Sequence, residues 1–339
     1  MNMKKIYRNT VVMIAVASIP LFLLSCERVK DDMDDCGVYL EFIYDYNMEY
    51  ADSFDPQVGK VDVFVFDAQG RYLFAKQSRR EDLIGGKRML LGVDLPSGKY
   101  KVLAIGGLSD SFTVSDADGN APVPGQTMLE EVEIALVHQT ETVSHEFSSL
   151  WVGAPLEFDF NADLVVSQVH LIKDTNRFNL ELAEVDGDGG TRANAPDYTF
   201  EISTSEPAVY HYDNEPFFNE PIVYRPYFLD QGDEPGELSA GRINTMRLIY
   251  GGDYFYRLAV NDNNTGRLLW DYDLLKLLKH IKPSSRPDGT ALPMQEFLDR
   301  QSEWHIVILY KEVIGGPEGF LAVGVKVNGW ILWLNEIGL

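Results

Sequence analysis

Apolar and polar residues alternate with a period of two along much of this chain, and this alternation is what most limits its fold. In residues 60–66, three valines fall on one face, and Asp62, Phe64 and Phe66 fall on the other. Successive side chains of a β-strand point to opposite faces, so this period is typical of strands packed in sheets. The chain is therefore expected to be mainly β.

The same alternation recurs in short segments through both halves of the chain. The strands expected in the first half are residues 38–46, 60–66, 71–74, 89–95, 99–105, 129–137 and 151–160. Those expected in the second half are residues 164–172, 177–184, 198–203, 222–228, 245–250, 254–260, 267–270, 306–310, 323–327 and 330–334. Asn328-Gly329 separates two apolar runs and predicts a two-residue hairpin. Short strands with turn signals between them predict antiparallel β-sandwiches.

Helical spacing is clear at one place in the second half. Its apolar residues at i, i+3, i+4 and i+7 are Leu274, Leu277, Leu278 and Ile281. Asp271 or Asp273 is placed to cap the start, and Pro283 ends the segment. A second short helix is expected from Pro293. One or two short helices therefore interrupt the second half.

The chain is long enough for two domains after its N-terminal segment is removed, since about 310 residues exceed one sandwich. Residues 159–163 are a polar gap between expected strands, so we place the boundary there. This gives an N-terminal sandwich over residues 37–160 and a C-terminal sandwich over residues 161–339. Residues 185–196 are richer in Gly and Asp, but their flanking strands resemble one hairpin, so they are interpreted as a long loop.

The N-terminus has the pattern of a secretory signal. Basic residues at positions 4–8 precede an apolar run over residues 11–24, which is short for a span because a bilayer needs about twenty residues. Residues 23–26, Leu-Leu-Ser-Cys, then resemble the lipobox of bacterial lipoproteins, in which the signal is cut off before the cysteine and the thiol receives diacylglycerol. Residues 1–25 are therefore predicted to be a signal peptide, and Cys26 is predicted to be lipidated.

Residues 26–36 form an acidic segment with four aspartates, ending at Cys36. One interpretation is a solvated tether, and the other is a resemblance to the acidic export signal that sends lipoproteins to the outer face of some Gram-negative cells. A disulfide between Cys26 and Cys36 would compete with lipidation for the same sulfur. Cys36 is interpreted as a small residue at the start of the first strand, with a reactive thiol as the alternative.

Charge limits the class of partner. Removal of residues 1–25 takes away three basic and no acidic residues, which leaves 26 basic against 52 acidic residues and a formal charge of −26. Such a surface repels nucleic acid and anionic headgroups, so neither is an expected partner. Attachment to the outer membrane is then expected through the acyl chains on Cys26.

The sequence contains no recognisable catalytic or metal-binding constellation. No two of its histidines stand at a zinc spacing, and it has no P-loop, Gly-x-Ser-x-Gly or Gly-x-Gly-x-x-Gly after a strand. The histidines are His138, His145, His170, His211, His280 and His305. Residues 116–119 and 186–189 resemble fragments of calcium loops, but Asp-Gly pairs are also ordinary turn residues. No catalytic, metal or cofactor-binding residue is therefore predicted, and the chain is not expected to be an enzyme.

Three tryptophans, Trp304, Trp330 and Trp333, gather in the last expected strands. Exposed rings could stack on a sugar, whereas aromatic residues on sandwich strands usually fill a core. The core interpretation is favoured.

Several segments in a fixed order resemble one known family. They are Cys26 with its acidic stretch, residues 42–47 (Phe-Ile-Tyr-Asp-Tyr-Asn), 61–67 (Val-Asp-Val-Phe-Val-Phe-Asp), 95–107 (Leu-Pro-Ser-Gly-Lys-Tyr-Lys-Val-Leu-Ala-Ile-Gly-Gly) and 327–330 (Val-Asn-Gly-Trp). This chain resembles the FimB-type fimbrial-anchor lipoproteins of type V pili. The resemblance implies two tandem transthyretin-like sandwiches, attachment to the cell outer membrane through Cys26, and a surface-exposed role at the base of a fimbrium.

The resemblance also implies that the chain binds a fimbrial stalk subunit by β-strand addition and limits the length of the fimbrium. Stalk precursors of this class lose their first strand to a protease. A cut after arginine finds no site between Arg28 and Arg71, and a cut at Arg71 would remove two strands. This favours an anchor over a stalk subunit. The alternatives are a stalk or tip subunit, a surface glycan-binding lipoprotein, and an enzyme of unknown chemistry.

Overall fold

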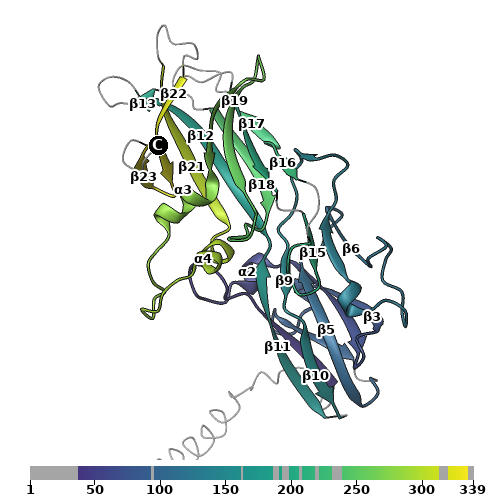
Figure 1. The fold of residues 1–339 in the computed structure, drawn as a ribbon. Helices are drawn as coiled ribbons and strands as arrows, with labels where there is room; N and C mark the ends of the chain where they lie inside the picture. Colours follow the sequence, from purple (N-terminus) through teal and green to yellow (C-terminus); the bar gives the residue numbers. More distant parts are fainter. Residues whose placement is uncertain are drawn as a thin grey trace, which may run out of the picture.

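A computed structural model of the chain describes residues 37–92, 95–161, 163–185, 191–192, 198–205, 208–217, 221–230, 239–312 and 320–334. Strands dominate these residues, so the predicted mainly β fold is confirmed. Figure 1 shows an elongated molecule, with an N-terminal half drawn below a C-terminal half that also carries the two longer helices.

The N-terminal half is built on one eight-stranded sheet. Its hydrogen-bonded order is β3-β2-β5-β9-β11-β1-β4, with β10 beside β5. The strands are β1 (Gly37–Ile43), β2 (Lys60–Asp67), β3 (Tyr72–Arg79), β4 (Arg88–Gly92), β5 (Gly98–Gly106), β9 (Trp151–Gly153), β10 (Leu156–Phe160) and β11 (Leu164–Lys173). Residues 151–160 were expected as one strand, but they divide because Pro155 cannot donate to the ladder.

β2 separates two hydrophobic cores. Its three valines are fully buried on the side of β1 and β11, in a core with residues such as Leu40 and Leu171. Phe64 and Phe66 are buried on the other side, in a core that continues into the C-terminal half. The alternation predicted for residues 60–66 is thus confirmed. Both faces are apolar because a second layer covers the strand.

That second layer includes a three-stranded sheet in the order β15-β7-β6. Its strands are β6 (Phe112–Ser115), β7 (Glu133–Leu136) and β15 (Val209–His211). Residues 129–137 were expected to be one strand, but they begin as a 3-10 turn at Leu129–Glu131 before β7. Glu131 fixes this turn, since its carboxylate accepts a hydrogen bond from the Met128 main-chain nitrogen at 2.9 Å.

The C-terminal half contains two further sheets. The seven-stranded sheet has the order β17-β18-β12-β21-β22-β23, with β13 beside β12, and the five-stranded sheet has the order β20-β19-β14-β16-β8. The strands of the first are β12 (Thr175–Val185), β13 (Thr191–Arg192), β17 (Phe228–Asp230), β18 (Ser239–Met246), β21 (Glu303–Glu312), β22 (Phe320–Val327) and β23 (Trp330–Trp333). Those of the second are β8 (Thr142–Val143), β14 (Tyr198–Thr204), β16 (Ile222–Tyr224), β19 (Tyr256–Asp262) and β20 (Leu268–Asp273).

The two halves exchange strands. β8, from the first half of the chain, pairs in parallel with β16 of the C-terminal half, and β15, from the second half of the chain, pairs with β7. β11 follows residue 160 but pairs with β1 and β9. Hydrogen bonding therefore joins β11 to the N-terminal sheet, and the chain enters the second sheet at Thr175, the first residue of β12. The boundary after residue 160 stays a prediction about separately folding units.

The two expected helices are present as α3 (Leu274–Ile281) and α4 (Met294–Arg300), and a four-residue helix, α2 (Phe54–Gln57), was not expected. The Asp273 side chain caps α3 by accepting a hydrogen bond from the Lys276 main-chain nitrogen at 3.0 Å. The helices of the described residues are all too short to cross a bilayer as apolar spans.

Candidate functional site

The predicted lipidation site, Cys26, and the second cysteine, Cys36, lie outside the described residues. The first described residue, Gly37, opens β1 and pairs with Leu164 and therefore with the start of β11. β1 and β11 run in parallel from this point toward the C-terminal half, which β11 reaches at Lys173. Gly37 thus lies at the end of the N-terminal sheet that is farthest from the C-terminal half.

The histidines are scattered over the described structure. His170 contacts Asp45 at 3.2 Å, and His305 contacts Glu181 at 2.9 Å. His280 occupies the last turn of α3, where a positive charge is favourable. Within the described ranges, no three His, Cys, Asp or Glu side chains form a group that could hold a metal ion.

The acidic loop at residues 116–119 is a turn. The Asp116 carboxylate accepts hydrogen bonds from the main-chain nitrogens of Asp118 and Asn120 at 3.0 and 2.9 Å. Gly119 adopts the left-handed φ of +78° that closes such a turn. The Asp116 carboxylate, which could have bound calcium, is therefore used for hydrogen bonds within its own turn. The second acidic loop, residues 186–189, lies outside the described residues.

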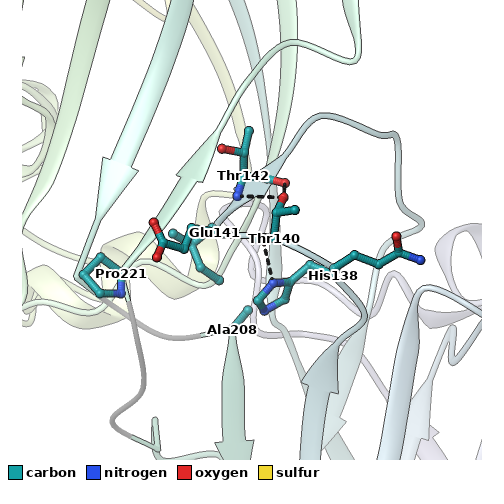
Figure 2. Close-up of a pocket in the computed structure, with 8 residues that line it drawn as sticks. His138, Thr140, Glu141, Thr142, Ala208 and Pro221 are labelled. Carbon is teal, nitrogen blue, oxygen red and sulfur yellow. Dashed lines mark hydrogen bonds between the residues drawn. The ribbon is translucent and has the colours of Figure 1, made fainter.

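One pocket, of about 620 Å³, lies where the segment before β8 meets the C-terminal half (Figure 2). It is lined by His138, Gln139, Thr140, Glu141, Thr142, Ala208, Pro221 and Ile222. His138 donates through Nδ1 to the Thr140 carbonyl at 2.9 Å, and the Thr140 hydroxyl donates to the Thr142 carbonyl at 3.0 Å. These polar groups stabilise the segment itself. The lining has one carboxylate, so it offers no carboxylate pair, and the His138 ring and the Thr140 hydroxyl are each bonded to a main-chain carbonyl rather than to each other.

A second pocket, of about 490 Å³, lies beside β19, β20 and α3. Its charged side chains already have partners, because Arg257 pairs with Asp271 and Asp273 caps α3. In both pockets, these polar side chains therefore already have partners within the protein.

The three C-terminal tryptophans divide between core and surface. Trp304 is fully buried, whereas Trp330 is 69% exposed and Trp333 is 40% exposed. The core interpretation is thus confirmed for Trp304 and wrong for the other two. The reason is the position of their strand: β23 is the last strand of the seven-stranded sheet, and β20, the last strand of the sheet that covers it, packs over β22. β23 therefore extends beyond the covering layer.

β23 differs from the other edge strands of the described sheets. Edge strands commonly carry charges that prevent pairing with another chain, and β3 has Lys76 and Arg79, β4 has Arg88, and β20 has Asp271 and Asp273. The sequence of β23 is Trp-Ile-Leu-Trp, and three of these four side chains are exposed. Among the described edges, it is the strand that has neither a charged nor a hydroxyl-bearing side chain. This edge is the candidate interaction site.

The hairpin that presents this edge is rigidly built. Asn328 and Gly329 have φ values of +45° and +90°, as a two-residue type I′ turn requires, which confirms the predicted hairpin. Asn328 also binds β21, since its nitrogen donates to the His305 carbonyl at 2.9 Å and its side-chain oxygen accepts from the His305 nitrogen at 2.8 Å. A Cβ on Gly324 would come within 3.0 Å of the Trp333 ring, so this glycine makes room for the ring.

The residues that sequence analysis missed form a buried polar cluster between the two halves. Arg247 donates to both carboxylate oxygens of Asp299 on α4, at 2.7 and 2.9 Å, and to the Asn214 carbonyl at 3.0 Å. The Asn214 side chain donates to Asp174 at 2.9 Å. Residues 245–250 were expected as a strand, but β18 ends at Met246 because Arg247 turns into this cluster. No spacing along the chain predicts this cluster, because its members come from four separate segments.

We expect Asp174→Asn to raise the free energy of unfolding at pH 8 by about 2–4 kcal/mol and to leave it nearly unchanged at pH 4. Burial raises the pKa of Asp174 to about 7, and its Oδ2 has no hydrogen-bond partner. Between pH 4 and 7 the folded state retains a proton that the unfolded chain releases, so the wild-type stability from this group falls as pH rises. Urea unfolding at pH 4, 6 and 8 measures the difference.

Glu296→Gln is the control, because the contribution of Glu296 to the free energy of unfolding depends on pH with the opposite sign. Hydrogen bonds from Arg286 lower the pKa of Glu296 to about 2, so its contribution is present above pH 4.5 and lost as pH falls toward 2. A difference between Asp174→Asn and wild type that does not change with pH would contradict the buried, protonatable carboxyl.

Comparison with protein families gives a match over residues 33–336 to the model of the fimbrillin-A associated anchor proteins Mfa1 and Mfa2. The match includes both halves and the β22–β23 hairpin. The chain belongs to this family of fimbrial anchor proteins. The predicted resemblance to fimbrial anchors is confirmed.

Individual relatives agree with the family. The minor fimbrium anchoring subunit Mfa2 of Porphyromonas gingivalis is 22% identical over 94% of this chain and 92% of its own length. Its solved structure, at 19% identity, shares the fold with a TM-score of 0.64 over 88% of this chain and 98% of that one.

Two other solved structures are more similar. A candidate adhesin from Bacteroides ovatus is 43% identical, with a TM-score of 0.80 over 91% of this chain and 98% of its own. A candidate polysaccharide-binding protein from Bacteroides thetaiotaomicron is 29% identical, with a TM-score of 0.75 over 90% of this chain and 100% of its own. The Mfa2 family fold therefore extends over nearly the whole chain, and the family is one of structural proteins of the fimbrium.

Proposed function

We propose that the chain is an outer-membrane lipoprotein that holds the base of a fimbrium and limits its length. Lipid on Cys26 fixes it to the cell surface, and a fimbrial stalk subunit binds to it by β-strand addition. The observation that carries this proposal is the family match over residues 33–336.

The position of Gly37 supports the proposed attachment. Residues 27–36 connect Cys26 to β1, and ten residues span at most about 35 Å when extended. The end of the N-terminal sheet at Gly37 and Leu164 is therefore held near the membrane, and the C-terminal half is directed away from it. This orientation presents the C-terminal half to a fimbrium.

The placement of β1 and β2 supports an anchor over a stalk subunit. β1 lies between β11 and β4, and β2 lies between β3 and β5. A cut after Arg71 would remove both strands from the inside of the sheet and expose the core that they share. A subunit that is not cut after Arg71 keeps β1 and β2, and it also keeps the lipid on Cys26, which precedes them in the sequence.

A glycan-binding surface protein is the competing function. It has some support from the exposed Trp330 and Trp333, and the relative described as polysaccharide-binding is in agreement with it. This function predicts that fimbriae are retained when the gene is deleted.

The test is a gene deletion in the fimbriated strain, complemented with wild type, Cys26→Ala or Cys36→Ala. The deletion strain and the Cys26→Ala strain are expected to shed fimbriae into the medium, because each CH₂ of an acyl chain contributes about 0.8 kcal/mol of membrane binding that the variant lacks. Cys36→Ala is the matched control and is expected to retain fimbriae. Membrane fractionation and the pilin content of the medium are measured, together with fimbrial length.

Unchanged fimbriae in the deletion strain would overturn the anchoring function. If the Cys26→Ala variant stays in the membrane fraction after a salt wash, the predicted lipidation of this residue is wrong.

A further inference from the structure

We propose that the open edge of β23 is the place where the fimbrial subunit adds its strand. This inference rests on the proposed anchoring function and names its contact site. The occupant is an extended segment of the subunit that bears apolar side chains on both faces.

Main-chain geometry supplies the bonding groups. Val327 and Trp330 flank the two-residue turn, so they form a hydrogen-bonded pair, and pairs alternate along an antiparallel ladder. Leu332 therefore bonds toward β22, while the N–H and C=O groups of Ile331 and Trp333 point to the open edge. No described strand pairs with β23 on that side. An added strand can bond to both residues without disturbing the hairpin.

The exposed side chains fit a strand better than a sugar. Trp330 and Trp333 are three positions apart, and successive side chains of a strand alternate, so the two rings lie on opposite faces. Rings on opposite faces cannot form one stacking platform. They can instead flank an added strand, one on each side of the sheet, with Ile331 beside Trp333.

The surroundings favour a different protein over a second copy of this chain. Without residues 1–25, each copy has a formal net charge of −26, so two copies repel each other when their edges approach. The edge also lies in the half that the proposed tether directs away from the membrane, where a fimbrial subunit has access to it.

The test uses the full-length lipoprotein in the deletion strain and compares three variants with wild type. Ile331→Pro removes one edge N–H and leaves the bonds to β22 in place. Trp333→Lys places a charge on the edge. Leu321→Lys is the matched control, because Leu321 is 53% exposed on β22, pairs with Lys311 of β21, and lies outside the stretch Gly324–Val327 that pairs with β23. Circular dichroism and a urea titration verify folding, and the membrane fraction verifies attachment.

The first two variants are expected to shed fimbriae as the deletion strain does, and the control is expected to retain them. Purified pilin should bind the first two variants at least about tenfold more weakly than wild type, a difference of about 1.4 kcal/mol.

Retention of fimbriae by the folded edge variants, while the deletion strain sheds them, would overturn the β23 site and leave the anchoring function intact. Retention by the deletion strain itself overturns the anchoring function, and this inference with it. A stable wild-type dimer that Ile331→Pro abolishes would also overturn the proposal, because the edge would then bind its own copy.

Discussion

Arg247→Met is expected to lower the free energy of unfolding by about 3–5 kcal/mol, because it leaves two buried carboxyl groups without their cation. The guanidinium contacts both oxygens of Asp299, whose side chain is 4% exposed, and its charge also acts on the fully buried Asp174. Methionine fills a similar volume, so the loss reports charge and hydrogen bonding more than packing. Urea unfolding at pH 7 measures it.

Arg225→Met is the matched control. Its partner Glu201 lies at 3.2 Å, but the Arg225 side chain is 56% exposed, so solvent screens the pair. A loss of about 1 kcal/mol or less is expected. Equal losses in the two variants would contradict a special role for the buried cluster.

Trp304→Ala is expected to cost about 3–5 kcal/mol, as for other fully buried large aromatic residues. The Trp304 ring stacks on Phe178, with centroids 6.1 Å apart, and meets Phe297 of α4 edge-on at 5.7 Å. Its Nε1 donates to the Asn176 side chain at 3.0 Å. Removal of the indole therefore opens a cavity between β12, β21 and α4 and leaves Asn176 without this donor. Thermal and urea unfolding measure the loss.

Trp330→Ala provides the comparison within the same group of tryptophans. This residue is 69% exposed, so the free energy of unfolding is expected to change by no more than about 0.5 kcal/mol. A large loss in this variant, or a small one in Trp304→Ala, would contradict the division between core and surface.

The orientation of the two halves relative to each other depends on contacts that no local sequence pattern predicts. Arg300 of α4 donates to the carbonyls of Asp45 and Asn47 at 3.1 Å each and lies over the rings of Tyr46 and Tyr50. Lys173 is buried beside Trp151 and reaches Glu303 at 3.4 Å. With the exchanged strands β8 and β15, these contacts make one continuous core from both halves. Because the core is continuous, we expect the unfolding of the two halves to be strongly coupled.

The sequence alone determined the features that depend on near neighbours. Period-two alternation predicted the two faces of β2, Asn328-Gly329 predicted the terminal hairpin, and the spacing of leucines predicted α3 with Asp271 or Asp273 as its cap. Each of these is decided within a few residues, where propensity and turn geometry act.

Only the tertiary structure decided which strands are neighbours and which side chains are covered. The pairing of β8 with β16, the cluster of Asp174, Arg247 and Asp299, and the exposure of Trp330 all join or separate residues that are distant in sequence. A strand has the same alternating pattern whether or not a second sheet covers it. The bare edge of β23 therefore depends on how far the neighbouring sheet extends, which alternation along a single strand cannot specify.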